Sequence, residues 1–209
     1  MAAKINTTQS VIEWGVATRP APGQTISGGT YLVAAHKDRV LLAAVDGLGR
    51  GSLATIAAET AMKILKKYAR DSIASLVKRC HRGLMMTRGA VMTLVSIDVR
   101  GGGTLWLGVG NVEGQLLRAQ RAAVPAIERL KLHGGVVGYQ MPKLQARKIS
   151  LEKDDLLVLT TDGVESDFTQ DLRLDEPAPK MAEQILARHF KGKDDALVLV
   201  ARFMGTAHE

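Results

Sequence analysis

The hydrophobic pattern along the chain predicts many short strands and three helices. Apolar or alternating runs predict strands over 11–18, 30–36, 39–45, 91–99, 104–109, 113–118, 147–151, 155–161 and 196–203. Apolar positions recur with helical spacing over about 52–68, 71–85 and 180–190, and Ser52 is the expected N-cap of the first helix. Short turns predict two hairpins, one joining 30–36 to 39–45 and one joining 147–151 to 155–161. The pattern therefore favours one α+β domain over 1–209, with sheet layered on sheet.

Composition is consistent with this predicted fold and adds few limits to it. The 209 residues are 46% hydrophobic, enough for one sizeable core. The single cysteine, Cys80, lies on an apolar helical stripe and has no disulfide partner, so a buried thiol and a cytoplasmic setting are expected. No apolar run reaches the roughly 18 to 20 residues that cross a bilayer, and the first residues lack a secretory core, so no membrane partner is expected.

The positive charge suggests a partner but does not identify it. A net charge of +7 raises the hypothesis of nucleic-acid binding. However, Lys and Arg are scattered along the chain, and aromatic residues, which stack on single strands, make up only 4% of it. A basic surface suited to an acidic or phosphorylated protein is therefore favoured over a nucleic-acid partner.

Acidic residues stand at the ends of three apolar strands. Asp46 and Asp162 each follow a strand, and the pair Asp194 and Asp195 precedes another. If the third strand runs antiparallel to the other two, all these carboxylates meet at one edge of a sheet. Clustered carboxylates repel one another, and hard divalent cations prefer oxygen ligands. The spacing suggests a metal site, and the alternative is a set of strand-end caps.

A glycine-rich loop follows the first of these strands. Its sequence, DGLGRG over 46–51, does not match the dinucleotide fingerprint or a Walker loop. By itself it is equally consistent with a tight strand-to-helix turn. The same strand-Asp-Gly arrangement recurs over 160–164, and this repetition favours a functional role for both aspartates.

Six ordered segments resemble the PPM-type metal-dependent serine/threonine protein phosphatases. They are VDGLGRG (45–51), TRGA (87–90), GVGN (108–111), GGVVG (134–138), LLVLTTDGV (156–164) and DDALVLVA (194–201). In its small size and in its DGLG-x-G and TRGA segments, the chain is most similar to the compact bacterial phosphatases of the stressosome. The resemblance implies a layered α-β-β-α sandwich of two antiparallel sheets flanked by helices, with an active site at one end.

The resemblance also implies roles for the acidic residues. Two Mn²⁺ or Mg²⁺ ions are expected, with Asp46 bridging both and the backbone carbonyl of Gly47 binding one. Asp162 and Asp194 complete the second site, while Asp195 is less suited as a ligand and orients its neighbour. In such a site a metal-bridged water attacks phosphorus directly, so the three aspartates act through that water.

Two features depart from the family pattern. Many relatives carry an acidic residue where this chain has Gly29, so either Glu13 or Asp38 substitutes, or one metal is held less tightly. The loop also lacks the histidine by which some relatives protonate the leaving oxygen. Either a metal-bound water takes that role, or Arg50 serves as a phosphate ligand. A solvated turn residue is the favoured interpretation of Arg50.

Three further polar residues are expected to lie outside the chemistry. His81 and His133 are distant in sequence from the Asp-Gly segments, so surface or partly buried roles are expected for them. Asn111 is expected to hold a turn.

The resemblance implies a cytoplasmic phosphatase for phosphoserine and phosphothreonine. Its expected partners are phosphorylated STAS-domain proteins of the stressosome, with no nucleic acid and no membrane. One alternative is a phosphatase acting on another regulator. A second is a catalytically weak member of the fold that binds phosphoproteins, and a third is a basic nucleic-acid-binding domain.

Overall fold

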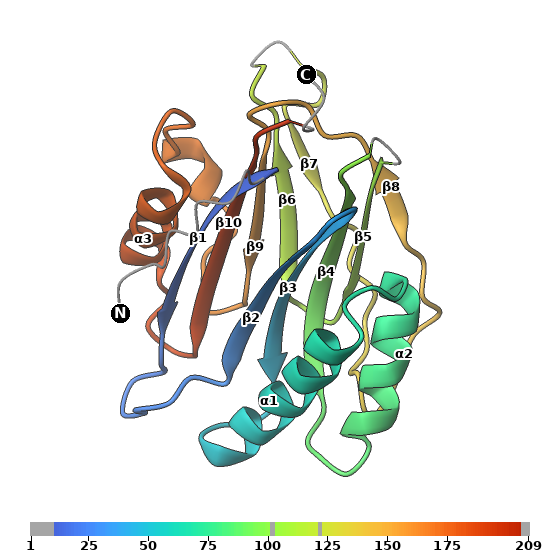
Figure 1. The fold of residues 1–209 in the computed structure, drawn as a ribbon. Helices are drawn as coiled ribbons and strands as arrows, with labels where there is room; N and C mark the ends of the chain where they lie inside the picture. Colours follow the sequence, from blue (N-terminus) through green and yellow to red (C-terminus); the bar gives the residue numbers. More distant parts are fainter. Residues whose placement is uncertain (1–10, 101–102, 121–122, 206–209) are drawn as a thin grey trace.

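Two five-stranded antiparallel sheets form the centre of the molecule in a computed structural model that describes residues 11–100, 103–120 and 123–205. One sheet has the order β1 (Ile12–Arg19), β10 (Ala196–Phe203), β9 (Leu156–Thr160), β6 (Glu113–Leu117) and β7 (Ile127–Arg129). The other has the order β2 (Gly29–His36), β3 (Arg39–Gly47), β4 (Ala90–Asp98), β5 (Gly103–Val109) and β8 (Arg147–Ile149). Figure 1 shows the two sheets packed face to face with helices outside them.

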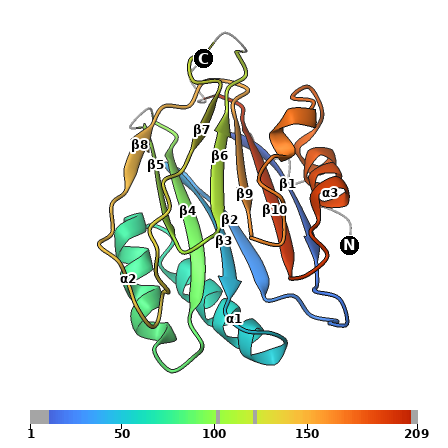
Figure 2. The same cartoon turned by 180° about the vertical axis from the view of Figure 1, so that it is seen from behind.

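The helices cover the outer faces of the sheets. Helices α1 (Ser52–Lys67) and α2 (Ile73–Leu84) pack on the β2–β8 sheet, and α3 (Ala178–His189) packs on the other. A short 3-10 turn, η1 (Phe168–Asp171), precedes α3. Seen from behind in Figure 2, the α1–α2 pair and α3 again lie on opposite sides. The expected α-β-β-α sandwich is confirmed.

The strands are apolar at successive positions because both faces of each sheet are buried. In β3, Leu41, Ala43 and Val45 pack under α1 and α2. The alternate residues, Leu42 and Ala44 among them, pack between the two sheets. This alternation lets one continuous run contribute to two core layers, and a third layer lies between the other sheet and α3. The buried Cys80 belongs to the layer beneath α1 and α2, as expected from the sequence.

Two local expectations are wrong. The segment around Arg147–Ile149 does not form a hairpin with β9, because β8 pairs with β5 while β9 pairs with β10 and β6. The turn after β8 thus crosses from one sheet to the other. Ser52 is the first residue of α1 rather than its cap; the N-cap is Gly51, and no side chain caps this helix.

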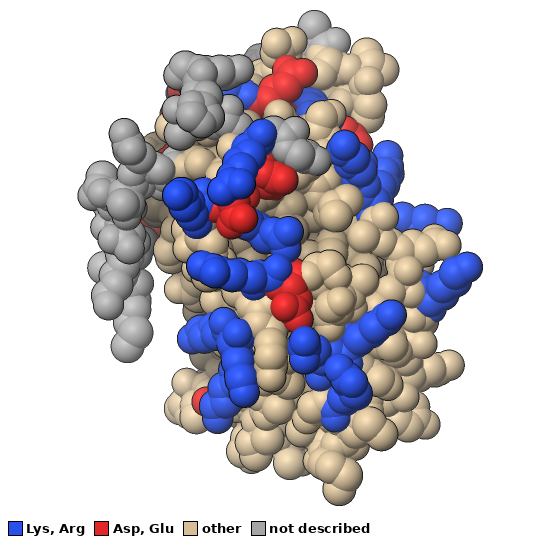
Figure 3. Space-filling view, turned by 45° about the vertical axis from the view of Figure 1, so that its right-hand side comes forward, with Lys and Arg blue, Asp and Glu red and all other residues tan. Residues whose placement is uncertain are grey.

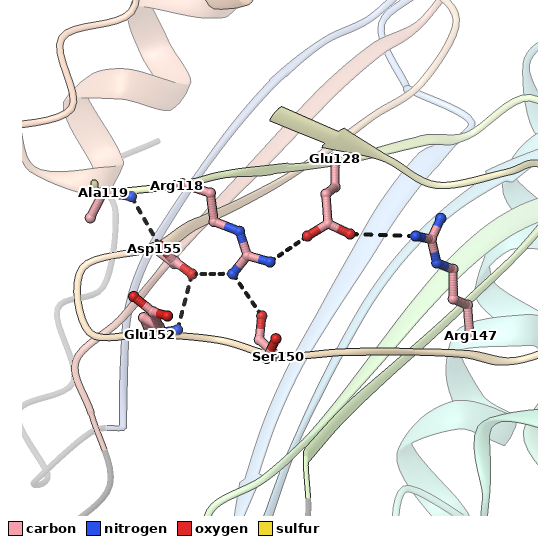
Figure 4. Close-up of polar contacts among 7 residues, drawn as sticks. All are labelled: Arg118, Ala119, Glu128, Arg147, Ser150, Glu152 and Asp155. Carbon is pink, nitrogen blue, oxygen red and sulfur yellow. Dashed lines mark hydrogen bonds and ion pairs between the residues drawn. The ribbon is translucent and has the colours of Figure 1, made fainter. Parts of the chain in front are cut away.

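A charged network fixes the end of the sandwich at which β6 finishes and β9 begins (Figure 4). Arg118 donates from Nη1 to the carboxylate of Asp155 and to the carbonyl of Ser150, both at 2.8 Å. Its Nη2 pairs with Glu128, which also lies 3.6 Å from Arg147. Asp155 and Asp162 flank β9, so at about 3.3 Å per residue this network is roughly 20 Å from Asp162. The network is therefore structural.

Among the described residues, no helix combines the length and the apolar character that crossing a membrane requires.

Candidate metal centre

Three strands deliver their acidic residues to one end of the sandwich. Asp46 lies near the end of β3, Asp162 follows β9, and Asp194 precedes β10, which runs antiparallel to β9. Asp46 is half-buried. Its pKa is raised from 3.8 to about 7, first by burial and then by the carboxylates of Asp162, Asp195 and Asp194. The four side chains therefore share one electrostatic environment.

Asp162 is exposed and is held by two residues from other elements. Its Oδ2 accepts a hydrogen bond of 2.7 Å from Asn111 Nδ2, and its backbone carbonyl accepts one of 2.8 Å from Lys191 Nζ. Burial and the Asp194 carboxylate raise its pKa, while Lys191 and Asn111 act in the opposite direction. Asn111 thus orients an aspartate in addition to occupying its turn, which the sequence analysis did not predict.

Asp195 uses both carboxylate oxygens to hold the loop between β1 and β2. Oδ1 accepts from the backbone of Ala21 and Oδ2 from that of Gly28, both at 2.7 Å, and the residue is 5% exposed. The neighbouring Asp194 is half-buried and accepts the Asp195 N–H at 2.9 Å. This arrangement agrees with a positioning role for Asp195 and leaves Asp194 as the better candidate ligand of the pair.

Close backbone packing explains why glycine follows both strand-end aspartates. A Cβ on Gly47 would lie 2.0 Å from the carbonyl oxygen of Ala54 in α1. A Cβ on Gly163 would lie 2.2 Å from the carbonyl oxygen of Asp195. Any side chain at either position would displace an element that carries the cluster. The Gly47 N–H donates to the Gly28 carbonyl at 3.2 Å, which ties the end of β3 to the loop held by Asp195.

The two suggested replacements for an acidic residue at Gly29 do not reach the cluster. Glu13 accepts from the backbone of Ala178 at 3.0 Å and pairs with Arg202 at 3.1 Å. Asp38 lies between β2 and β3, at the opposite end of β3 from Asp46. Gly29 itself is paired directly with Asp46 in the β2–β3 register. The position opposite Asp46 therefore lacks a carboxylate.

The structure gives no catalytic role to the remaining candidates. Arg50 is exposed in the loop between β3 and α1, and its role as a phosphate ligand stays a prediction. His81 is partly buried, and its Nδ1 accepts the Gly138 N–H at 3.0 Å, a structural contact.

A second acidic group lies just beyond Asp162. Glu165, Asp167 and His189 place their possible ligand atoms within 4.8 Å of one another. His189 Nδ1 lies 3.9 Å from Glu165 and 3.7 Å from Asp167, and both carboxylates are exposed. Edge-on packing of His189 against Phe168, with ring centroids 6.4 Å apart, gives the histidine a structural role.

The aspartate cluster fits divalent cations by the chemistry of its donors. It offers hard oxygen atoms, and burial together with the neighbouring carboxylates raises the pKa of Asp46 to about 7. A bound cation would relieve that repulsion. Asp46, Asp162, Asp194 and the Gly47 carbonyl are the groups available to hold it.

The sequence carries a family signature across most of its length. Residues 36–204 match the model of the family described as Stage II sporulation protein E (SpoIIE). The chain belongs to the SpoIIE family. The chain thus carries a PPM-type phosphatase domain, as the sequence segments indicated.

Individual relatives agree with the SpoIIE family assignment. The phosphoserine phosphatase RsbX of Bacillus subtilis (strain 168) is 23% identical over 181 residues, covering 86% of this chain and 89% of RsbX. A structure from work on the bacterial stressosome as a modular system controlling secondary messenger signalling is 29% identical, with a TM-score of 0.82 over 91% of this chain and 99% of the other. RsbX in complex with magnesium is 22% identical, with a TM-score of 0.80 over 91% of this chain and 94% of the other.

Proposed function

We propose that this protein is a metal-dependent phosphatase that removes phosphate from phosphoserine and phosphothreonine in STAS-domain proteins of the stressosome. The observation that carries the proposal is the convergence of four carboxylates from three separate chain segments, which together with the burial of Asp46 raises the pKa of that residue to about 7. Membership of the SpoIIE family and similarity to RsbX support the same reaction and the same pathway.

Each residue of the cluster has a proposed part in the reaction. Asp46, near the centre of the acidic group, is the proposed bridge between two Mn²⁺ or Mg²⁺ ions, with Asp162 and Asp194 as further ligands. When bound, such ions lower the pKa of a water molecule and neutralise charge on phosphate oxygens. Asp195 holds the β1–β2 loop against the cluster, and Asn111 fixes the orientation of Asp162.

Lys191 and Arg50 supply positive charge at the rim. Lys191 lies against the backbone of Asp162, and Arg50 is exposed in the glycine-rich loop. Both are cationic groups that a phosphate approaching the carboxylates would meet. The only described cysteine is buried with its pKa raised to about 12 by burial, so it does not supply a nucleophile.

Hydrolysis of p-nitrophenyl phosphate tests the reaction. Wild-type protein should hydrolyse it in Mn²⁺ or Mg²⁺ and lose this activity in EDTA. Asp162→Asn should lose at least about 100-fold, a few kcal/mol of lost transition-state stabilisation. The matched control, Asp38→Asn, removes an exposed carboxylate at the other end of β3 and should keep full activity.

A phosphorylated STAS-domain protein tests the substrate. Release of phosphate from it, faster than from unrelated phosphoproteins, supports the proposed pathway. Turnover of p-nitrophenyl phosphate without preference for that protein would favour a phosphatase for another regulator. The missing carboxylate opposite Asp46 favours the remaining candidate, a phosphoprotein-binding member of weak activity; folded protein that binds a phosphoprotein without turning it over would establish it.

A further inference from the structure

The excess positive charge of the chain is concentrated in one short stretch. Residues 60–90 contain eight of the 28 Lys and Arg residues and one of the 21 Asp and Glu residues, a net charge of +7. This equals the net charge of the whole protein. The rest of the chain holds twenty residues of each sign and is neutral. Basic residues are scattered along the sequence, but the uncompensated charge is not.

This stretch forms most of the α1–α2 layer and the loop that follows it. Seven of its eight basic side chains are exposed: Lys63, Lys66, Lys67, Arg70, Lys78, Arg82 and Arg88. The eighth, Arg79, pairs with Asp71 at 2.7 Å, so it neutralises the one acidic residue of the stretch. Glu59 is the only other acidic residue on the two helices. Figure 3 looks toward the side that carries α2 and shows Lys and Arg spread over it with fewer Asp and Glu between them.

The basic layer ends at the candidate metal centre. The Leu48 N–H, in the glycine-rich loop, donates to the Gly89 carbonyl at 2.9 Å. Arg88 is exposed beside this contact, and its Cγ lies 4.0 Å from the Cβ position of Gly49. Asp46 pairs with the beginning of β4, the strand that starts directly after this loop. A partner lying along α2 therefore reaches the loop that follows Asp46 by way of Arg88.

The surface has the chemistry of a protein-binding site. Met85 and Met86, 62% and 96% exposed, lie between the basic residues of α2 and Arg88. Exposed methionines adapt to apolar side chains of a protein partner. The one tyrosine of the layer, Tyr68, has Arg79 4.1 Å from its ring centroid and Lys67 5.3 Å from it. It is thus engaged by cations and does not offer the open stacking face that bases require.

We infer that the α1–α2 layer is a docking surface for an acidic protein segment, and that it delivers a phosphorylated residue of that partner to the aspartate cluster. The inference rests on the proposed phosphatase function and adds the chemical class of the partner. Positive charge at the C-terminal end of α1, on α2 and at Arg88 attracts an acidic partner at low ionic strength and loses its effect as salt shortens the Debye length.

Paired phosphoserine peptides provide the test, one flanked by glutamates and the other by glutamines at the same positions. At low salt the wild-type protein should hydrolyse the glutamate-flanked peptide with a kcat/KM about tenfold or more above that for the glutamine-flanked peptide. High salt should remove this preference. Turnover of p-nitrophenyl phosphate should not depend on the docking surface, so it reports separately on the phosphatase function.

Charge-reversal variants locate the effect. The triple variant Lys63→Glu, Lys66→Glu and Lys67→Glu should lose the peptide preference and keep p-nitrophenyl phosphate turnover. The pair Lys78→Glu and Arg82→Glu on α2 tests the same surface independently, should the first variant fail to fold. A matched control reverses three exposed lysines outside the stretch: Lys131, Lys143 and Lys153. The control should retain the preference.

Binding measured by fluorescence anisotropy separates the two proposals. Selective binding of the glutamate peptide without turnover of any phosphate ester would sustain the docking surface and overturn the phosphatase function. Turnover with equal kcat/KM for both peptides would support the phosphatase function and overturn the docking surface. Tighter binding of a single-stranded oligonucleotide, or of phosphatidylserine vesicles, lost in the same α1 and α2 variants, would assign the surface to nucleic acid or lipid and overturn the inference.

Discussion

Replacing Asp46 by asparagine should stabilise the metal-free protein at the same time as it destroys the candidate metal centre. Asp46 is the carboxylate on which burial and three other carboxylates act together. Asparagine has nearly the same shape and no charge, so Asp46→Asn removes the repulsion while leaving the packing of β3 against α1 in place. A residue that serves metal binding rather than folding should behave in this way.

The size of the effect follows from the pKa of Asp46, which is raised from 3.8 to about 7. The folded protein holds this proton to a higher pH than the unfolded chain does. The stabilising contribution is therefore fully present below pH 3.8 and is lost as the pH rises through about 7. At 1.36 kcal/mol per pKa unit, lowering the pH from about 8 to about 5 should raise the free energy of unfolding of the wild type by about 2 to 3 kcal/mol.

Urea unfolding in EDTA, followed by circular dichroism, measures this contribution. At about pH 8 the free energy of unfolding of Asp46→Asn should exceed that of the wild type by about 2 to 4 kcal/mol. At about pH 5 the difference should fall to about 1 to 2 kcal/mol, because Asp46 is then protonated in the folded protein but still largely ionised in the unfolded chain. Equal m-values would show that the variant changes stability and not the surface exposed on unfolding. Asp38→Asn, at the other end of β3, should show no such pH-dependent difference.

Adding Mn²⁺ at the higher pH should reverse the order of stability of the wild type and Asp46→Asn. A ligand that binds only the folded state stabilises it in proportion to the logarithm of its concentration. The wild type should gain stability and Asp46→Asn should not. If Asp46→Asn is instead destabilised by the same amount at both pH values, or if Mn²⁺ stabilises both proteins equally, the electrostatic account of the cluster is wrong.

Three other perturbations test separate parts of the structure. Metal affinity, measured by titration calorimetry, should fall about tenfold per pH unit below about pH 7 and level off above it, because Asp46 must lose its proton to bind; an affinity independent of pH would contradict this. Gly29→Asp, which places a carboxylate opposite Asp46 in the strand register, should tighten Mn²⁺ binding about tenfold and destabilise the protein in EDTA; weaker binding in a folded variant would refute the role given to that position. Arg118→Met should lower the free energy of unfolding by about 3 to 5 kcal/mol, because Asp155 and Glu128 lose their partner; p-nitrophenyl phosphate turnover per folded molecule should stay unchanged, and a selective loss of turnover would show that this network reaches the metal centre.

The strand ends could be read from the sequence because they depend on local patterns. Runs that are buried on both faces are apolar throughout, and a charged residue marks where each run leaves the core. This logic located Asp46, Asp162 and Asp194 at strand ends. It also misled at 147–161, where an alternating segment, a short turn and an apolar run look like a hairpin although the strands belong to different sheets. Strand pairing depends on partners far along the chain, which no local pattern records.

The contacts around the carboxylates are likewise long-range. Asp195 holds backbone groups 174 and 167 residues away, and Asn111 reaches Asp162 across 51 residues. No sequence spacing indicates these bonds. The concentration of net charge on α1 and α2 was accessible from the sequence, but its meaning depended on knowing that the two helices form one outer layer beside the aspartates.

Anomalous diffraction from crystals soaked in Mn²⁺ tests the central claim most directly. We expect two peaks bounded by the carboxylates of Asp46, Asp162 and Asp194 and by the Gly47 carbonyl, with Asp195 still bonded to the backbone of the β1–β2 loop. Crystals that bind Mn²⁺ only between Glu165, Asp167 and His189, with none at the strand-end aspartates, would contradict it.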